Sequence, residues 1–285
     1  MLLFRALIAT LLVSAPFAAV HAQDAPEPVE RTSNSERDTI TVGAGVAVIP
    51  SYEGSDDYIP IPAGAIRGRV SGFNFASRGT ILGVDVLRDR SSTGLDIQLG
   101  PVVNFNFNRV GRIVDPQVRA LGSRRLAFEA GGYFGVAKTG VFTSSYDTLG
   151  ASVTVLADTT GVHQSYTISP TINYGTPLSR RAYVGISLAG TWAGDGYART
   201  YFGIDPAGAV RSSLPQFANP RGGFKNYTVG ALGNYMLRGD LERGLGLYLV
   251  GAFSQYQGDF ARSPVVSVAG SRNQFYGAVG LGYTF

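Results

Sequence analysis

The chain ends in Gln274-Phe-Tyr-Gly-Ala-Val-Gly-Leu-Gly-Tyr-Thr-Phe285. Successive side chains of a β-strand point to opposite faces. One face of this segment would carry Phe275, Gly277, Val279, Leu281, Tyr283 and Phe285, and the other Tyr276, Ala278, Gly280, Gly282 and Thr284. A transmembrane β-strand has such a pattern, because its outer face meets lipid and its inner face is small or polar.

Alternation alone also fits a half-buried edge strand of a soluble β-protein, so this segment leaves both readings open. A terminal Phe285 with Tyr283 two residues before it resembles the signal by which the barrel-assembly machinery recognises outer-membrane proteins. That resemblance implies the machinery as a partner.

The amino-acid composition favours a membrane β-protein over a soluble one. Charged residues make up 15% of the 285 residues, whereas soluble domains average ~25%. Beyond the N-terminus no apolar run approaches the ~20 residues that a membrane helix needs. The chain has 38 glycines and no cysteine, which excludes a disulfide framework and thiolate chemistry.

The N-terminus has the features of an export signal. Met1–Ala22 is predicted to be a cleaved Sec signal peptide, with Arg5 at its positive start and Val20-His21-Ala22 as the cleavage site. Residues 23–38 are rich in Pro, Glu, Ser and Arg, which predicts a flexible periplasmic leader. Residues 39–285 are predicted to form one domain in the outer membrane.

The same alternation recurs along the chain, with Gly, Ser, Thr and Asn on the polar face. A soluble sandwich would carry charges on that face, whereas small polar groups suit the interior of a barrel. The pattern predicts an all-β fold, a transmembrane antiparallel up-and-down barrel. Its clearest segments are Ile40–Val48, Leu95–Phe107, Leu126–Val136, Val162–Tyr174, Ala182–Trp192 and Leu245–Phe253.

The predicted connections alternate between short and long, as in outer-membrane barrels. The segmentation gives about twelve strands, with ten or fourteen as alternatives. The least certain segments are the short Phe73–Ser77 and Val141–Leu156, which fits one strand or two. The predicted periplasmic turns are Ser71-Gly72, Arg88–Gly94, Lys138–Gly140, Thr176–Arg180 and Arg238–Gly244, and the long outer loops are Val110–Arg125, Gly194–Gly223 and Gly258–Ser271.

Four short motifs in the predicted outer loops and at the end of the chain resemble the MipA/OmpV family of MltA-interacting outer-membrane proteins. They are Pro50-Ser-Tyr52-Glu-Gly54-Ser55-Asp56-Asp57-Tyr58, Tyr201-Phe202-Gly203-Ile204 followed by Ser213-Leu214-Pro215, Arg262-Ser263-Pro264-Val265-Val266 and the terminal Tyr283-Thr-Phe285. The resemblance covers the chain from about residue 39. It implies a non-enzymatic scaffold that links a lytic transglycosylase to a penicillin-binding protein; other members are described as porin-like or adhesive.

The motif residues have a structural interpretation as well. Gly54 and Gly203 suit backbone positions with positive φ, and Pro264 can fix a bend. The aromatic residues are expected to pack the outer loops over the barrel mouth: Tyr52, Tyr58, Tyr201 and Phe202. A partner surface is the alternative, since exposed loops often carry function.

An enzymatic alternative rests on His163 and Ser165, which a strand would place on one face, as a base and a nucleophile require. The spacing resembles that of outer-membrane phospholipases and lipid A deacylases. No third residue to orient the base is identifiable, and the pair shares the face assigned to the lumen. A hydrogen-bonded lumen histidine is therefore the expectation, and no enzymatic activity is predicted.

No cofactor or metal site is predicted, since one histidine outside the signal peptide and no cysteine cannot form a typical zinc or iron shell. Asp56-Asp57 is interpreted as solvated loop charge, with weak Ca²⁺ binding as the alternative. No basic run interleaved with aromatics indicates nucleic acid. The expected surroundings are outer-membrane lipid and lipopolysaccharide. A small-solute channel stays open as a second function, because a lumen lined by Gly, Ser and Asn permits a pore.

Overall fold

The computed structural model describes residues 38–87 and 95–285. The predicted signal peptide, all of the leader except Asp38, and the predicted turn Arg88–Gly94 lie outside these residues. No helix in the described part of the chain is long and apolar enough to span a membrane.

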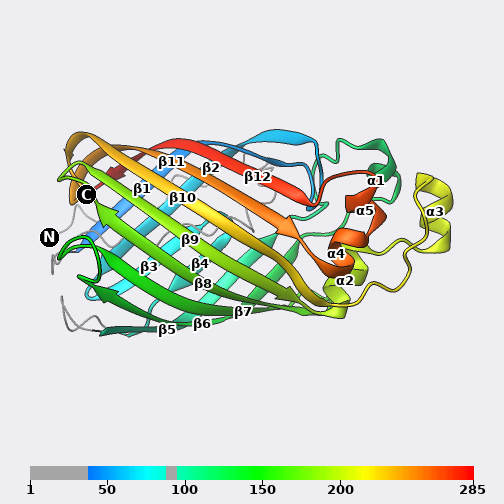
Figure 1. The fold of residues 1–285 in the computed structure, drawn as a ribbon, viewed down its shortest axis with the longest axis horizontal. Helices are drawn as coiled ribbons and strands as arrows, with labels where there is room; N and C mark the ends of the chain where they lie inside the picture. The colour runs from blue at the N-terminus through cyan, green and yellow to red at the C-terminus, as the bar shows by residue number, and fades with distance from the viewer. Residues whose placement is uncertain (1–37, 88–94) are drawn as a thin grey trace, which may run out of the picture.

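The described residues form a closed antiparallel barrel of twelve strands, in which each strand pairs with its neighbour in sequence and β1 pairs with β12 (Figure 1). The predicted fold class and strand number are confirmed. The strands are β1 Thr39–Pro50, β2 Tyr58–Val70, β3 Phe73–Arg78, β4 Ile81–Val84, β5 Leu95–Asn106, β6 Ala127–Thr139, β7 Thr148–Asp158, β8 Tyr166–Pro177, β9 Ala182–Ala193, β10 Gly223–Asp240, β11 Arg243–Tyr256 and β12 Asn273–Thr284.

The alternating faces are oriented as the sequence predicts. On β12, Phe275 is 58% exposed and Leu281 is 48% exposed on the outer surface, while Gln274 and Thr284 on the opposite face are buried. β12 closes the barrel against β1, with Val46 opposite Val279 and Thr41 opposite Thr284. The apolar face of each such strand is therefore left for lipid, because no protein layer covers it.

Aromatic side chains gather near the outer ends of neighbouring strands, as the interfacial belts of membrane barrels do. Three pairs of rings on adjacent strands have centroids 4.7–5.3 Å apart. A fourth pair, Tyr283 and Phe285, lies at the opposite end. The three outer pairs are Phe105–Phe128, Trp192–Phe224 and Phe253–Phe275.

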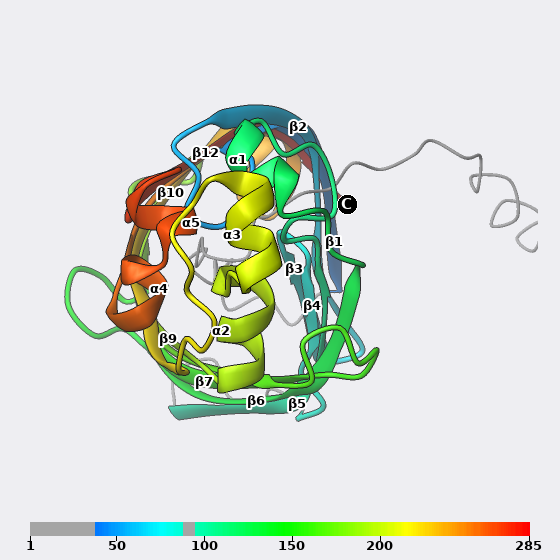
Figure 2. The same ribbon diagram turned by 90° about the vertical axis from the view of Figure 1, so that its right-hand side faces the viewer.

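The two ends of the barrel differ. The helices of the described residues lie at the end away from Asp38 and Phe285, and Figure 2 shows them across the barrel mouth. Long loops mark the extracellular end of such barrels, so this end is the outer one. The helices are α1 Pro116–Ala120, α2 Asp195–Phe202, α3 Pro206–Ser212, α4 Gly258–Arg262 and α5 Pro264–Ser267.

Several predicted boundaries shift. Residues 141–147 form a periplasmic turn before β7, because the carboxylate of Asp147 accepts the N–H groups of Val141, Phe142 and Thr143. β10 runs for 18 residues to Asp240, which reduces the next turn to residues 241–242. The segment Val162–Tyr174 is divided, since β8 begins only at Tyr166.

Candidate functional site

The motifs of three outer loops meet above the barrel mouth. Ser263 Oγ donates a hydrogen bond to the carbonyl of Phe202 (2.6 Å), and the Tyr52 hydroxyl donates to the carbonyl of Ala269. The side chains of Tyr52, Phe202 and Ser263 are fully buried. Burial raises the pKa of the Tyr52 hydroxyl, which keeps it a neutral donor. Residues 61 and 217 positions apart in sequence thus hold one another in place.

These loops share an apolar interior of their own, which we call the loop core. It consists of Tyr52, Ile113, Val118, Leu121, Ile204, Leu214, Val265 and Ala269. A second buried cluster joins α2 to α4 and to the end of β11 through Tyr197, Phe202, Tyr256 and Phe260. Burial of this much apolar surface makes the outer end an ordered layer instead of a set of free loops.

The two motif glycines serve different purposes. Gly54 has φ +95°, as predicted, and an added Cβ would lie 2.4 Å from Cγ2 of Val266. The prediction of positive φ for Gly203 is wrong, since its φ is −76°. Gly203 is required for a different reason: a Cβ there would lie 2.4 Å from the carbonyl oxygen of Arg199 at the end of α2.

The other motif residues shape the turns. Pro50 is the last residue of β1 and is buried. Ser55 is fully buried, and its Oγ accepts the N–H of Asp57 at 3.1 Å. Pro264 is the first residue of α5, which Ser263 caps by accepting the N–H of Val265. Tyr58 differs from the expectation, because it lies on β2 with 39% of its surface exposed and does not pack over the mouth.

Beneath the loop core a buried ion pair crosses the lumen. Lys225 Nζ on β10 lies 3.1 Å from Oε1 of Glu53 in the first outer loop, and both side chains are at most 3% exposed. The Tyr197 hydroxyl of α2 donates to the same oxygen at 2.7 Å, and Lys225 lies over the Tyr197 ring. Sequence reasoning missed this pair. The available signal was the rarity of lysine, since Lys138 and Lys225 are the only two in the chain.

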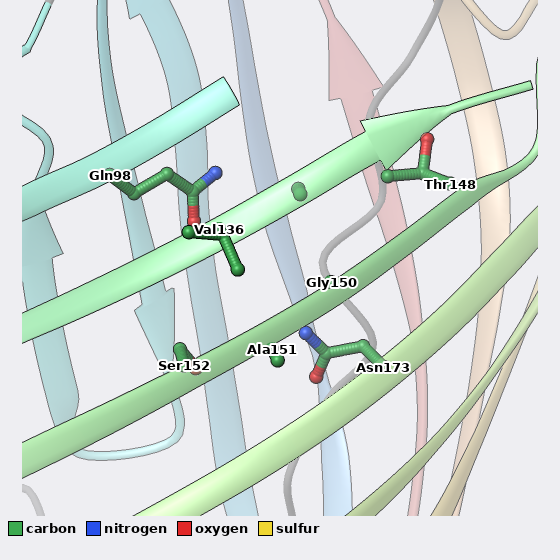
Figure 3. Close-up of a pocket in the computed structure, with 8 residues that line it drawn as sticks. Gln98, Val136, Thr148, Gly150, Ala151, Ser152 and Asn173 are labelled. Atoms are coloured by element: carbon green, nitrogen blue, oxygen red, sulfur yellow. The ribbon is translucent and has the colours of Figure 1, made fainter. Parts of the chain in front are cut away.

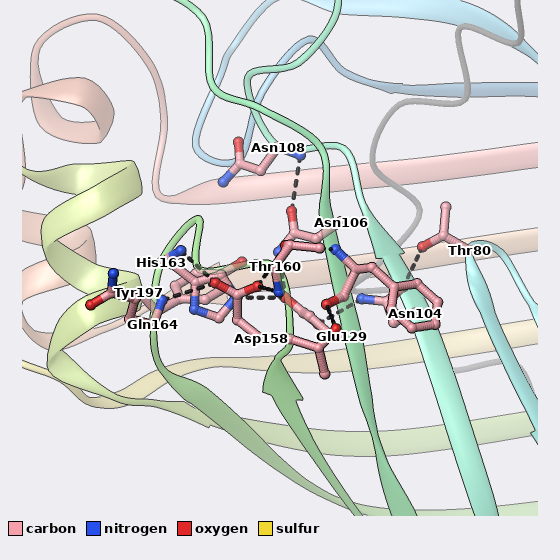
Figure 4. Close-up of polar contacts among 12 residues, drawn as sticks. Thr80, Asn104, Asn106, Asn108, Glu129, Asp158, Thr160, His163, Gln164 and Tyr197 are labelled. Carbon is pink, nitrogen blue, oxygen red and sulfur yellow. Dashed lines mark hydrogen bonds and ion pairs between the residues drawn. The ribbon is translucent and has the colours of Figure 1, made fainter.

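A second polar network lies beside it at the outer ends of β5 and β6 (Figure 4). Asn104 and Asn106 donate hydrogen bonds of 2.9 and 2.8 Å to the two carboxylate oxygens of Glu129. The side-chain oxygen of Asn106 accepts the N–H of Asn108, and that of Asn108 accepts the N–H of Glu53. The inner wall is therefore joined by hydrogen bonds to the first outer loop.

His163 completes this network. It lies in the β7–β8 loop and not on a strand, so the predicted strand position is wrong, while its side chain points into the barrel mouth and is buried. Nε2 lies 3.0 Å from Glu129, and we assign the proton to Nε2 because a carboxylate only accepts. The ring packs against Tyr197 and Tyr201 of α2, with centroids 5.2 and 5.9 Å away.

The alternative pairing of His163 with Ser165 has no support in this geometry. In the described part of the chain no hydrogen bond joins the two side chains, and the imidazole points to Glu129. The described residues also contain no group of three or more His, Cys, Asp or Glu side chains that could hold a metal ion. The arrangement is suited to tying loops to the wall.

Below the closed mouth the inner wall is polar. Figure 3 shows a small pocket on the inner side of β5–β8, lined by Gln98, Ser152 and Asn173 among others. Gly150 keeps the wall thin there, since an added Cβ would come within 3.3 Å of the Asn173 amide nitrogen. The residues that line this pocket include no acidic, basic or histidine side chain that could activate a hydroxyl, and the lining is consistent with a solvent-lined lumen.

The periplasmic end exposes an apolar cluster. Phe142 is 71% exposed, Tyr146 is 57% exposed and Leu178 in the next turn is 64% exposed. The Phe142 ring also contacts Tyr174. Burial alone would raise the pKa of the Asp147 carboxyl, but the N–H donors of residues 141–143 hold that pKa well below its usual value. The carboxylate therefore stays ionised and keeps the turn ordered.

Comparisons with known proteins agree with this architecture. A family described as "MltA-interacting protein MipA" matches residues 42–285. No curated protein matches the sequence. Among solved structures, the chain is similar to an outer membrane channel from Pseudomonas putida F1, at 11% identity and TM-score 0.47, covering 91% of this chain and 100% of that one. It is also similar to an anion-selective porin from Comamonas acidovorans, at 9% identity and TM-score 0.36, covering 87% of this chain and 99% of that one. The chain belongs to the MltA-interacting protein MipA family and is an outer-membrane β-barrel.

Proposed function

We propose that this protein is a non-enzymatic scaffold that holds murein-processing enzymes at the inner surface of the outer membrane. The family description, MltA-interacting protein, supports a lytic transglycosylase as one partner, and a penicillin-binding protein is the proposed second. Export by a cleaved signal peptide, insertion by the barrel-assembly machinery and contact with lipopolysaccharide belong to the same proposal.

The observation that carries the proposal is the closed outer end. The Glu53–Lys225 ion pair joins the first outer loop to β10, and two buried clusters pack the outer loops over the mouth. A buried pair of this kind holds its geometry, because separating the charges leaves each uncompensated at low dielectric. A barrel closed in this way favours anchoring over free diffusion of solutes.

The apolar cluster at the periplasmic end is the proposed partner surface. Phe142 and Tyr146 stand on a turn fixed by Asp147, so they can be buried by a partner with little loss of conformational entropy. Exposed aromatics are the residue type that most often dominates binding energy at protein interfaces. Because the other periplasmic turns are short and offer little surface to a partner, this cluster is the proposed contact.

A pull-down from solubilised envelopes tests the scaffold. The Phe142→Ser/Tyr146→Ser variant is expected to lose a co-purifying lytic transglycosylase that the wild type retains. Val210→Ser is the matched control, since Val210 is 83% exposed at the outer end, on α3. Equal recovery with both variants, or no transglycosylase with the wild type, would count against the proposal.

A small-solute channel is the second candidate, favoured by the polar inner wall around Gln98 and Asn173. Planar-bilayer recordings distinguish the two. Single-channel steps from the wild type support the channel. A silent wild type that conducts only after Glu53→Ala supports a closed scaffold, because that substitution removes the ion pair across the mouth.

A further inference from the structure

The barrel wall is incomplete beyond the tip of the β3–β4 hairpin. The tip is held on one side by the Ile66 N–H, which donates to Ser77 Oγ at 2.8 Å, and on the other by the Phe105 N–H, which donates to Thr80. β2 continues toward the outer end from Ile66 to Tyr58, and over this length it pairs only with β1 among the described strands. At about 3.4 Å per residue, this free edge is on the order of 25 Å long.

The free edge is depleted in hydrogen-bond donors. Because Ile66 directs its N–H toward β3, the other even-numbered residues of β2 face the same side: Tyr58, Pro60, Pro62 and Gly64. Two of these four are prolines, which have no N–H. An unpaired donor in hydrocarbon costs several kcal/mol, so proline suits an edge that faces lipid. The two prolines also make the edge a poorer template for pairing with a further strand.

The inner side of this edge is apolar, unlike the polar interior that is typical of such barrels. Ile59 and Ile61 point inward and are each 8% exposed. Phe107 and Val114, from the loop after β5, pack against the buried cluster that contains them. An apolar lining therefore lies directly behind the part of the wall where a strand is missing.

We propose that the free edge of β2 is a lateral binding site for an acyl chain of a lipid in the surrounding outer leaflet. The chain enters beside Pro60 and Pro62 and lies against Ile59, Ile61 and Phe107. Lipid is the occupant that the chemistry favours, because the outward faces of the neighbouring strands already meet hydrocarbon and the edge lacks two of the four donors that a peptide strand would use. The site is independent of the periplasmic partner surface.

A tryptophan reporter tests the proposal. Trp192 is the only tryptophan, so Phe107→Trp in a Trp192→Phe background gives one emitter behind the free edge. In bilayers of phosphatidylcholine with brominated acyl chains, its emission is expected to be quenched nearly as strongly as that of Trp192 in the wild type, which is 43% exposed on the outer surface. The added substitution Ala63→Phe, which fills the apolar lining, is expected to reverse the quenching.

The matched control is Tyr183→Trp in the same background, because Tyr183 is 2% exposed on the inner face of β9, where β8 and β10 complete the wall. Equal quenching of this control, or no quenching of Phe107→Trp, would overturn the proposal. If Phe107→Trp does not yield a heat-modifiable barrel, Val114→Trp takes its place with the same expectations.

A second measurement addresses the competing occupant, a strand from another copy. The chain has no cysteine, so Gly64→Cys places a single thiol on the free edge. Under mild oxidation in bilayers the protein is expected to stay monomeric. An efficient disulfide-linked dimer would instead show that a second β2 edge occupies the site, and would overturn the lipid assignment.

Discussion

The outer and periplasmic ends of this barrel are built on opposite principles. At the outer end four loops bury aromatic residues against one another and are tied to the wall by Glu53–Lys225 and Glu129–His163. At the periplasmic end the connections are short, and the one longer described turn, residues 140–147, exposes its aromatics. Tertiary packing maintains the first end, whereas local hydrogen bonds maintain the second. This difference supports the proposal that partners bind at the periplasmic end.

The largest expected effect comes from breaking the buried ion pair. Glu53→Ala should lower the free energy of unfolding by about 3–5 kcal/mol, because Lys225 is left buried without its counter-charge. Urea titration of the detergent-solubilised barrel measures this. Arg199→Ala is the control, since Arg199 and Asp195 form an exposed pair at 4.0 Å whose loss should change stability by less than about 1 kcal/mol. Equal effects would mean that the mouth is not sealed by this pair.

The contact between loops is tested by glycine substitutions at the outer end. Gly54→Ala should destabilise the protein by about 2–4 kcal/mol, because a side chain at φ +95° is strained and would also clash with Val266. Gly122→Ala has similar strain at φ +85° but meets open space, so about 1 kcal/mol is expected. The difference between the two unfolding free energies isolates the packing of the first loop on α5.

At the periplasmic end, Asp147→Asn should loosen one turn and leave the barrel intact. The amide cannot replace both carboxylate oxygens as acceptors for residues 141–143. Hydrogen exchange at these N–H groups is expected to accelerate while exchange in β6 and β7 is unchanged. Since the folded-state pKa of Asp147 is depressed, its contribution is present above the usual aspartate pKa of about 3.9 and declines as the pH falls below that value. If hydrogen-exchange protection of these N–H groups depends neither on pH nor on this substitution, Asp147 does not order the turn.

The smallest effect on stability is expected at the last residue. Phe285 is 64% exposed and contacts Tyr283, so Phe285→Ala should change the free energy of unfolding by less than about 1 kcal/mol. Its yield in the outer membrane should nevertheless fall, if the terminal aromatic is the assembly signal. The heat-modifiable fraction of newly made protein measures assembly, and Thr284→Ser, whose side chain faces inward, is the control.

Much of the barrel was predictable because alternate residues of a membrane strand face lipid and the lumen, and their residue types differ accordingly. The faces of β1, β9, β11 and β12 lie as predicted, since each outward position meets lipid irrespective of its neighbours. The prediction was wrong where a side chain depends on a distant partner. His163 follows the alternating pattern but belongs to a loop, because Asp158 at the end of β7 accepts the N–H groups of residues 163 and 164 and β8 begins only at Tyr166.

The candidate sites were less predictable from the sequence. Gly54, Ser55 and Ser263 were singled out by motif, but the pattern does not tell that Glu53 would be paired with Lys225, 172 residues away. Nor does it reveal the free edge of β2, since the prolines at 60 and 62 indicate an edge only when the length of its neighbour is known.

The sequence by itself determined the class of fold, the lipid-facing side of each strand and the family, because these depend on local alternation and short motifs. Only the tertiary structure decided that the outer loops pack together over the mouth, that the periplasmic turn exposes its aromatics, and that the free edge of β2 pairs with no described strand. The outer loops meet through contacts between residues far apart in the chain, and the free edge of β2 follows from the short β3–β4 hairpin. Local alternation along one strand specifies neither of them.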